Sequence, residues 1–326
     1  MLTIDELVRF AETLDPEERH SPVADAAAEE WGLDRPLFVR SSASHVFVAP
    51  RREEDDQGRQ RGRVVLRLRP DTEPHREVLE RGARAAASWY GAGAPVANAV
   101  ASSSGRFTHS VEGYVVQALA AVEGEILEGR ADLAQHAAAW GEALARLHLH
   151  GHGIVDAPDA VDLLSLEAHG TADDDVATLA VLLGRRLAEL PRTSEVFGVL
   201  HGDPEADNAV LLDDGVVLVD PDDVRRGWFV SDVAFALRDW ATVSGGVDLD
   251  AEVPGRFLEG YHRVRSLSDE EIGWLPLMAQ ASAVEDLLAF QAHLEVQPQP
   301  DWPDWAVDLD HRVRARAAAL RAELSV

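Results

Sequence analysis

VLHGDPEADNAVLLDDGVVLVDPDD, residues 199–223, carries eight acidic side chains around two short apolar runs. Asp-Asp-Gly at 213–215 separates the runs, and Asp-Gly between apolar segments is a strong β-hairpin signal because glycine supplies the positive φ of the turn. A three-residue loop places Asn208 directly across from Asp220, whereas a two-residue loop shifts the partner by one residue. In either register, an amide and a carboxylate emerge at the open end of the hairpin.

An amide and a carboxylate in this arrangement suit Mg²⁺, a hard cation that takes oxygen ligands and usually shares them with phosphates. Asp203 lies five residues before Asn208, in a loop that precedes the first strand. A separate carboxylate at such a position can accept a proton from a hydroxyl group. These are the parts of a phosphoryl-transfer site, in which metal ions neutralise the phosphates and a base orients the attacking oxygen.

Composition narrows the class of protein further. The 326 residues suffice for one large domain or two lobes, and 46% of them are hydrophobic. There is no cysteine, which excludes disulfides and thiol chemistry. The N-terminus lacks a signal-peptide pattern and no apolar run is long enough to span a membrane, so we expect a cytoplasmic protein.

The formal net charge of −28 argues against nucleic acid and anionic membranes as partners. The same charge makes it difficult to bind a polyanion such as a nucleotide without a counter-cation, and a divalent metal would solve this problem. All 30 Lys and Arg residues are arginines, so any role that needs a basic side chain on phosphate falls to arginine.

Periodicity predicts strands and helices in the first third of the chain and mainly helices afterwards. The predicted strands lie at 37–50 (two short strands or a hairpin), 63–70, 96–101 and 113–119. The predicted helices lie at 3–14, 22–32, 74–93, 131–151, 161–170, 175–190, 230–243, 253–264, 270–295 and 310–324. This order predicts an α+β protein whose lobes divide near residue 118.

The pattern His201-Gly-Asp203-x4-Asn208, followed by eleven residues and Asp220, resembles a known catalytic and metal-binding segment. It is similar to that of the aminoglycoside phosphotransferase/choline kinase family, a relative of the protein-kinase H-R-D-x4-N and D-F-G signatures. The continuation over 219–234 looks most like the branch that contains homoserine kinase-like enzymes and bacterial stress-response kinases.

The resemblance implies a two-lobed, protein-kinase-like fold of the aminoglycoside phosphotransferase type. Residues 1–118 would form a nucleotide-binding N-lobe with a mixed β-sheet and N-terminal helices. Residues 119–326 would form a mainly helical C-lobe with the catalytic loop, the metal site and the acceptor site. The hinge would lie near 115–119, where Gln117 and Leu119 would contact the nucleotide.

Carried over position by position, the resemblance makes Asp203 the catalytic base and makes Asn208 and Asp220 the ligands of Mg²⁺. It assigns supporting roles to His201, Asp223 and Asp232. His201 would brace the catalytic loop, and Asp232 would cap and orient it.

In the N-lobe, Arg67 occupies the place of the family's strand lysine, which contacts the α- and β-phosphates. Its fixed guanidinium fork can bind phosphate with two hydrogen bonds. The partner carboxylate on the following helix would be Glu80 or Glu77, and spacing slightly favours Glu80. Ser42 belongs to a nucleotide-covering loop, Ser41–His45, that has no glycine, so serine hydroxyls would have to help the backbone amides.

The expected reaction is transfer of the γ-phosphoryl group of ATP or GTP to a hydroxyl of a small molecule. An acidic lining from Glu205, Asp207, Asp222 and Asp223 favours a cationic acceptor, such as an aminoglycoside or another antibiotic, or an amino alcohol. An antibiotic as acceptor would imply a role in antibiotic resistance. Three alternatives remain open: a Ser/Thr protein kinase of the stress-response type, a nucleotide-binding pseudokinase without turnover, and an acidic structural protein that binds no nucleotide.

Overall fold

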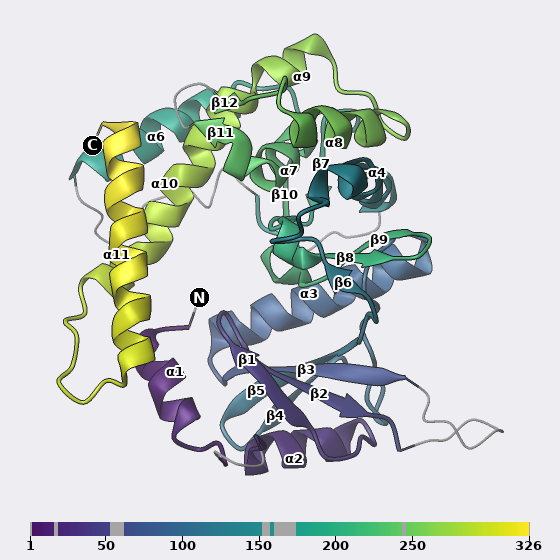
Figure 1. The fold of residues 1–326 in the computed structure, drawn as a ribbon, viewed down its shortest axis with the longest axis vertical. Helices are drawn as coiled ribbons and strands as arrows, with labels where there is room; N and C mark the ends of the chain where they lie inside the picture. The colour runs from purple at the N-terminus through teal and green to yellow at the C-terminus, as the bar shows by residue number, and fades with distance from the viewer. Residues whose placement is uncertain are drawn as a thin grey trace.

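A five-stranded sheet forms the centre of the N-terminal lobe (Figure 1). The structure is a computed structural model, and it describes residues 2–15, 19–52, 62–151, 157–159, 174–242 and 246–325. The strands, in the order β1-β2-β3-β5-β4, are β1 (Leu37–Ser41), β2 (His45–Pro50), β3 (Arg63–Pro70), β5 (Tyr114–Ala120) and β4 (Thr108–Val111). Each neighbouring pair is antiparallel. The helices of this lobe are α1 (Ile4–Ala11), α2 (Pro22–Glu30) and α3 (Glu73–Gly91).

Alternation along β3 gives this sheet two different faces. Val64, Leu66 and Leu68 are fully buried and join a core that includes residues of α1 and α2. Because side chains alternate along a strand, Arg67 and Arg69 point to the opposite face. That face is covered by α3, which packs against β5 and lies between the sheet and the C-lobe (Figure 1). The two arginines therefore face the junction of the lobes.

The C-terminal lobe is mainly helical. Its helices are α4 (Leu133–His150), α6 (Asp174–Ala188), α7 (Phe229–Ala236), α8 (Glu252–His262), α9 (Asp269–Gly273), α10 (Leu275–Leu294) and α11 (Asp304–Leu324). Its strands are β6 (Glu125–Ile126), β8 (Ala209–Leu212) and β9 (Gly215–Leu218), which form one sheet, and the pairs β7 (Phe197–Leu200) with β10 (Arg225–Trp228) and β11 (Ala241–Thr242) with β12 (Gly246–Val247).

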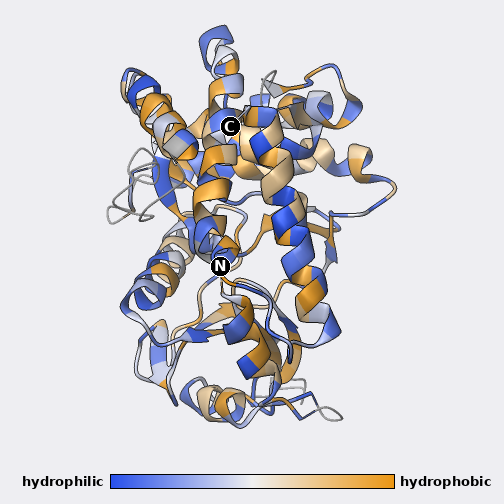
Figure 2. Ribbon diagram, turned by 90° about the vertical axis from the view of Figure 1, so that its left-hand side faces the viewer, coloured by the Kyte–Doolittle hydropathy of each residue, from blue (hydrophilic) through white to orange (hydrophobic). Residues whose placement is uncertain are grey.

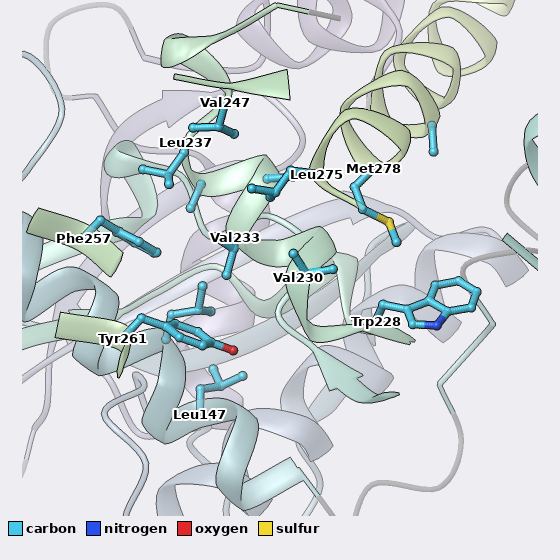
Figure 3. Close-up of a cluster of buried hydrophobic side chains, with 14 of the residues drawn as sticks. Leu147, Trp228, Val230, Val233, Leu237, Val247, Phe257, Tyr261, Leu275 and Met278 are labelled. Atoms are coloured by element: carbon cyan, nitrogen blue, oxygen red, sulfur yellow. The ribbon is translucent and has the colours of Figure 1, made fainter. Parts of the chain in front are cut away.

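Side chains from several helices meet in the core of the C-lobe, as Figure 3 shows for Leu147, Val233, Tyr261 and Met278. Two of the helices, α4 and α8, approach each other very closely. A Cβ atom at Gly260 would lie 1.8 Å from the carbonyl oxygen of Ala138, so only glycine fits at this contact. The close packing fixes the N-terminal half of α4 against α8, and near the other end of α4 His148 contacts Asp232.

Helix α3 connects the two lobes. Ala83 and Ala86 pack against Leu119 of β5, whereas Trp89, about one turn after Ala86, belongs to the C-lobe core. Gly82, directly before Ala83, lies against a short 3-10 turn at Pro221–Asp223, and a Cβ atom at Gly82 would be 2.5 Å from the Pro221 carbonyl oxygen. The helix therefore sets where the segment after β9 lies relative to the sheet.

Helix α1 also contacts both lobes. Phe10 stacks on His45 at the start of β2, with ring centroids 3.6 Å apart. At the other end of the helix, Asp5 accepts a hydrogen bond of 3.1 Å from the indole of Trp302, just before α11. Figure 1 shows α1 between the sheet and α11, and the view in Figure 2 shows apolar and polar residues alternating along the helices, as expected for amphipathic helices that bury one face.

The structure confirms the α+β architecture with a sheet-bearing N-lobe and a mainly helical C-lobe, although the N-lobe sheet is antiparallel rather than mixed. The strand predicted at 96–101 is wrong, because this segment forms only isolated bridges at Val96 and Ala99. The expected lobe boundary after residue 118 falls inside β5. The helix predicted at 161–170 lies outside the described residues. Within the described ranges, no helix is long and apolar enough to cross a membrane.

Candidate active site

Asp203 and Asn208 lie side by side in the loop between β7 and β8. The Asn208 amide donates hydrogen bonds to the Asp203 carboxylate, at 2.9 Å, and to the Asp203 carbonyl, at 3.1 Å. A short 3-10 turn, Ala206–Asn208, brings the two residues together, and the Asn208 N–H donates to the Glu205 carbonyl at 3.0 Å. The predicted base and the first predicted metal ligand therefore share one local structure.

The hairpin places Asp220 one residue beyond the position across from Asn208. In β8 and β9 the pairing ends with Leu212 opposite Gly215, so the loop has two residues, and Val219 donates its N–H to the Asn208 carbonyl at 2.9 Å. The backbone then turns sharply, because Asp220 has left-handed dihedral angles (φ 63°, ψ 61°). Such a conformation is uncommon for a residue other than glycine and often marks a functional position.

Arg67 reaches across the lobe junction to this turn. Its guanidinium makes an ion pair of 2.7 Å with Asp220 and a second ion pair with Asp222. Arg69, two residues further along β3, also pairs with Asp222. All of these side chains except Asp220 are almost completely buried. The predicted phosphate-binding arginine thus lies beside the predicted metal ligand.

The two glutamates predicted as partners of Arg67 lie elsewhere. Glu80 is partly exposed and pairs with Arg84 at 2.6 Å, while its other oxygen accepts a hydrogen bond of 3.2 Å from Thr108. Glu77 is exposed on the surface of α3. Among the described residues, the ion pairs of Arg67 involve Asp220 and Asp222 from the C-lobe rather than either glutamate.

The remaining predicted nucleotide contacts are in different environments. Ser42 is exposed, and its N–H donates to the Ser44 carbonyl at 3.1 Å in a tight turn. The Gln117 side chain is fully buried and donates to the Leu79 carbonyl of α3 at 3.0 Å. Leu119 is buried against α3. The structure therefore uses the Gln117 and Leu119 side chains to attach α3 to the sheet, and leaves Ser42 at the surface.

Asp232 of α7 holds in place the loop that contains the predicted catalytic base. It accepts the N–H groups of His201, at 2.8 Å, and of Gly202, at 3.0 Å, and also a hydrogen bond of 3.0 Å from His148 of α4. The other ring nitrogen of His148 lies 2.8 Å from the Tyr261 hydroxyl. Although burial opposes it, the hydrogen bond from His148 helps to keep the pKa of Asp232 below its ordinary value. A buried carboxylate thus orients the loop without being available to substrate.

A close backbone contact locks the same loop against the segment after β9. Gly202 has a φ of +90°, and a Cβ atom there would lie 1.9 Å from the Asp223 carbonyl oxygen. The side chain of Asp223 is exposed, while that of His201 is fully buried. His201 thus packs inside the loop, and Asp223 contributes a backbone contact and an exposed carboxylate.

Negative charge and burial together raise the proton affinity of the site. Burial, followed by the charges of Glu205, Asp223 and Asp220, raises the pKa of Asp203 to about 8. Burial raises the pKa of Glu205 to about 7, although the Arg238 guanidinium, which pairs with it, acts in the opposite direction. A carboxyl group whose pKa lies near neutrality is suited to accept a proton from a hydroxyl group.

Burial and the neighbouring arginines shift the pKa values of Asp220 and Asp222 in opposite directions. Burial raises the pKa of Asp220 more than the nearby Arg67 lowers it. Burial acts on Asp222 as well, but the Arg67 and Arg69 guanidiniums outweigh it and lower the pKa of Asp222. Asp222 is therefore fully compensated by arginine, whereas Asp220 remains a site where additional positive charge would be stabilised.

The donor atoms at this site fit a hard divalent cation. Asp220 and Asn208 offer carboxylate and amide oxygens, and one Asp203 carboxylate oxygen is buried without a hydrogen-bond partner. Among the described residues, no group of three or more His, Cys, Asp or Glu side chains is arranged to hold a metal. Mg²⁺ is usually bound through one or two carboxylates together with waters and substrate phosphates, so the small protein donor set agrees with that ion.

Sequence reasoning did not identify several residues that build the site. Arg69 alternates with Arg67 on one face of β3, and this spacing was its only signal. His148 lies at the end of α4 and Tyr261 lies on α8, both far from the motif, and the sequence alone does not place either of them beside Asp232. Arg238 comes from a short 3-10 turn at Arg238–Trp240 after α7 and neutralises Glu205.

The sheet-bearing and helical lobes, with an Asp–Asn–Asp set at their junction, define a kinase-like phosphotransferase fold. The chain belongs to the family described as the phosphotransferase enzyme family, whose model matches residues 51–274. Two curated relatives are homoserine kinases. That of Bradyrhizobium sp. (strain ORS 278) is 34% identical over 163 residues, which cover 47% of this chain and 50% of the relative. That of Methylobacillus flagellatus is 28% identical over 207 residues, which cover 59% and 61%.

The chain spans between half and about three-fifths of the length of these two relatives. Two solved structures share the fold along nearly the whole chain. An amicoumacin kinase in complex with AMP-PNP and Ca²⁺ has a TM-score of 0.69 at 16% identity, with 95% of each chain covered. A microcompartment-associated aminopropanol kinase has a TM-score of 0.64 at 17% identity, with 93% of this chain and 97% of that chain covered.

Proposed function

We propose that this protein transfers the γ-phosphoryl group of ATP or GTP to a hydroxyl group of a small molecule that carries at least one amine. Asp203 acts as the general base on the acceptor hydroxyl, and Asn208 and Asp220 hold Mg²⁺, which neutralises the phosphate oxygens when it is bound. We place the reaction in the cytoplasm. The observation that carries the proposal is the contact between Asp203 and Asn208 beside Asp220, at the junction of the lobes.

The raised pKa of Asp203 supports its role as the base. In the metal-free protein, the Asp203 carboxyl has a pKa of about 8 and holds a proton at neutral pH. A bound Mg²⁺ would lower this pKa and release the proton, and the resulting buried carboxylate accepts a proton from an alcohol more readily than an exposed aspartate does. The Asn208 amide donates to one of its oxygens and fixes its orientation. The second oxygen is buried and has no hydrogen-bond partner among the described residues, so it is the atom that would accept the hydroxyl proton.

The charge of the site supports an acceptor with few positive groups. Of the four acidic residues expected to line the acceptor site, Asp222 is neutralised by two arginines and Glu205 is paired with Arg238. Asp207 and Asp223 remain for the acceptor. Two carboxylates suit an amino alcohol or an amino acid with a hydroxyl better than a polycation that needs several counter-charges.

Relatives suggest which acceptors to test first. Curated relatives are homoserine kinases, and solved structures with this fold include an aminopropanol kinase and an amicoumacin kinase. We therefore expect turnover with a member of a panel of homoserine, short amino alcohols, amicoumacin-type antibiotics and aminoglycosides, each assayed with Mg²⁺ and either ATP or GTP. Nucleotide consumption that depends on the acceptor, together with a phosphorylated product, is the expected result.

Asp203→Asn is the matched inactive variant, and Asp213→Asn, in the exposed turn of the hairpin, is its control. We expect Asp203→Asn to lower kcat by several orders of magnitude while nucleotide binding is kept, because binding does not require the base. Asp213→Asn should leave kcat unchanged. Equal activity of Asp203→Asn and the wild type would contradict the assignment of the base.

The same assay separates the alternative functions. Autophosphorylation without any small acceptor would indicate a protein kinase. Stabilisation by Mg-nucleotide without turnover of any acceptor would indicate a pseudokinase, and two observations are compatible with this result. The turn at Ser42–Ser44 has no glycine, and Arg67 is already engaged by two carboxylates.

A further inference from the structure

Two arginines and two aspartates form a compact ion cluster at the junction of the lobes. Arg67 and Arg69 come from β3, and Asp220 and Asp222 come from the turn after β9. Arg67 pairs with both aspartates, whereas the ion pair of Arg69 within the described part of the chain is with Asp222. The cluster holds two positive and two negative charges, and three of its four members are almost fully buried. Each carboxylate can therefore be neutralised without leaving a charge unpaired.

Arg69 has a second contact, on the other side of its guanidinium. Its Nε donates a hydrogen bond of 2.8 Å to the hydroxyl of Ser44, which is 1% exposed. The Ser44 carbonyl in turn accepts the N–H of Ser42 at 3.1 Å and closes the turn between β1 and β2. Arg69 therefore connects the glycine-free turn of the N-lobe to Asp222, which lies 153 residues away in the chain.

Whether Arg67 is needed to neutralise Asp222 depends on Arg69. With Arg69 present, Asp222 has its own cation, and Arg67 can leave the cluster for a phosphate group while Asp222 stays neutralised. Without Arg69, Arg67 is the one arginine among the described residues that forms an ion pair with either carboxylate. Moving it to a phosphate would then leave Asp222 buried and uncompensated, which is strongly unfavourable.

We propose that Arg69 is a positioning residue for nucleotide binding: it neutralises Asp222 so that Arg67 is free to bind phosphate, and it holds the Ser42–Ser44 turn through Ser44. This inference rests on the proposed function, since it requires that the protein bind a nucleotide at the lobe junction. It assigns Arg69 and Asp222 to the nucleotide site as a pair, although neither needs to touch the nucleotide.

The test measures the dissociation constant of Mg-ATP and Mg-GTP by calorimetry with purified full-length protein, without any acceptor. The variants are Arg69→Gln, Asp222→Asn and the double variant. We expect Arg69→Gln to bind nucleotide about 10- to 100-fold more weakly, because it leaves Asp222 to compete for Arg67. The double variant should recover most of the lost affinity, because one arginine and one aspartate then remain and the charges balance again.

Two further variants complete the design. Arg69→Lys loses the planar guanidinium that reaches Ser44 but keeps the positive charge beside Asp222. Because the charge is kept, this variant should bind nucleotide much better than Arg69→Gln. If Arg69→Gln is not folded by circular dichroism, Arg69→Lys and the double variant carry the comparison, and the inference then requires both to bind nucleotide within about tenfold of the wild type. Arg63→Gln is the control, since Arg63 lies on the same strand with an exposed side chain paired to Glu123.

The possible results distinguish a failure of this inference from a failure of the proposed function. If the wild type binds neither nucleotide, the proposed function fails and this inference fails with it. If the wild type binds and Arg69→Gln binds equally well, the inference is wrong while the proposed function stands. A purely structural tether predicts that the double variant is at least as weak as Arg69→Gln, so an absence of recovery would also overturn the inference.

Discussion

Replacing Asp203 by asparagine should make the nucleotide-free protein more stable at alkaline pH, even though it removes the proposed base. Burial and neighbouring acids raise the pKa of Asp203 from an ordinary 3.8 to about 8. Between these pH values the folded protein holds a proton on Asp203 that the unfolded chain has released. Folding therefore takes up a proton, and the free energy of unfolding falls as the pH rises through this range.

The magnitude follows from the pKa shift. One proton taken up on folding changes the free energy of unfolding by about 1.4 kcal/mol per pH unit, so Asp203 alone accounts for at most about 4 kcal/mol between pH 5 and pH 8. Glu205 and Asp220 also have raised pKa values and share the same field. Because these groups readjust when Asp203 is replaced, we expect the advantage of Asp203→Asn to grow by about 2 kcal/mol from pH 5 to pH 8.

The assay is thermal unfolding of the wild type, Asp203→Asn and the exposed control Asp213→Asn in a metal chelator at pH 5, 6.5 and 8. For a chain of 326 residues, 2 kcal/mol corresponds to a change of about 3 °C in Tm. Asp213→Asn should show no pH-dependent advantage. An advantage of Asp203→Asn that is constant or shrinks with rising pH would refute the argument that Asp203 is destabilised by burial and like charges.

Three other substitutions test the frame around the site. Gly82→Ala should lower nucleotide affinity and stability, because its Cβ atom would lie 2.5 Å from the Pro221 carbonyl oxygen. Its control, Gly184→Ala, lies in a helix with open space around the new Cβ atom and should stabilise the protein slightly. Equal Tm shifts for the two variants would contradict this reasoning. Asp232→Asn should lower kcat by about tenfold or more in the acceptor assay, since the buried Asp232 carboxylate accepts two loop N–H groups. Unchanged kcat would show that the loop holds its shape without this charge. Phe10→Ala should reduce the free energy of unfolding in urea by about 3–5 kcal/mol, because Phe10 is fully buried in the N-lobe core; a loss below 1 kcal/mol would place it outside that core.

Much of the fold follows from sequence because its signals are local. The alternation in β3 and the helical periodicity of α3 and α4 predict those elements, and the Asp-Gly turn predicts the hairpin of β8 and β9. The short strands β7 and β10 escaped prediction. Each has four residues and pairs with a strand more than 20 residues away, so neither has a local turn signal.

The segment 96–101 shows why an extended sequence need not become a strand. Ala97 donates its N–H to Leu218 of the C-lobe hairpin at 2.9 Å, whereas Val100 donates to Ala118 of the N-lobe sheet at 2.8 Å. The segment thus divides its backbone hydrogen bonds between the two lobes, one at a time, and never forms a continuous ladder with either. Its residues are compatible with an extended backbone, but its hydrogen-bond partners lie in two different lobes, so it does not pair as a strand.

The candidate site likewise contains residues that the sequence alone brings together and residues that it does not. Asp203, Asn208 and Asp220 come from a single stretch of the chain, so the motif spacing and the turn chemistry are enough to bring them together. The partner of Arg67 could not be found in this way. Helical spacing from β3 pointed to α3, yet the carboxylates that meet Arg67 lie more than 150 residues further along the chain.

Charge is the property that local sequence describes least well at this site. Eight acidic residues between 199 and 223 suggest a strongly negative surface that attracts cations. In the folded protein, Arg67 and Arg69 arrive from the sheet and Arg238 arrives from the turn after α7, and each neutralises a carboxylate of that stretch. A buried carboxylate is tolerated when a cation accompanies it, so acidic residues and distant arginines are parts of one arrangement. The charge available to an acceptor is therefore what remains after these pairings, and a count of acids along the chain overstates it.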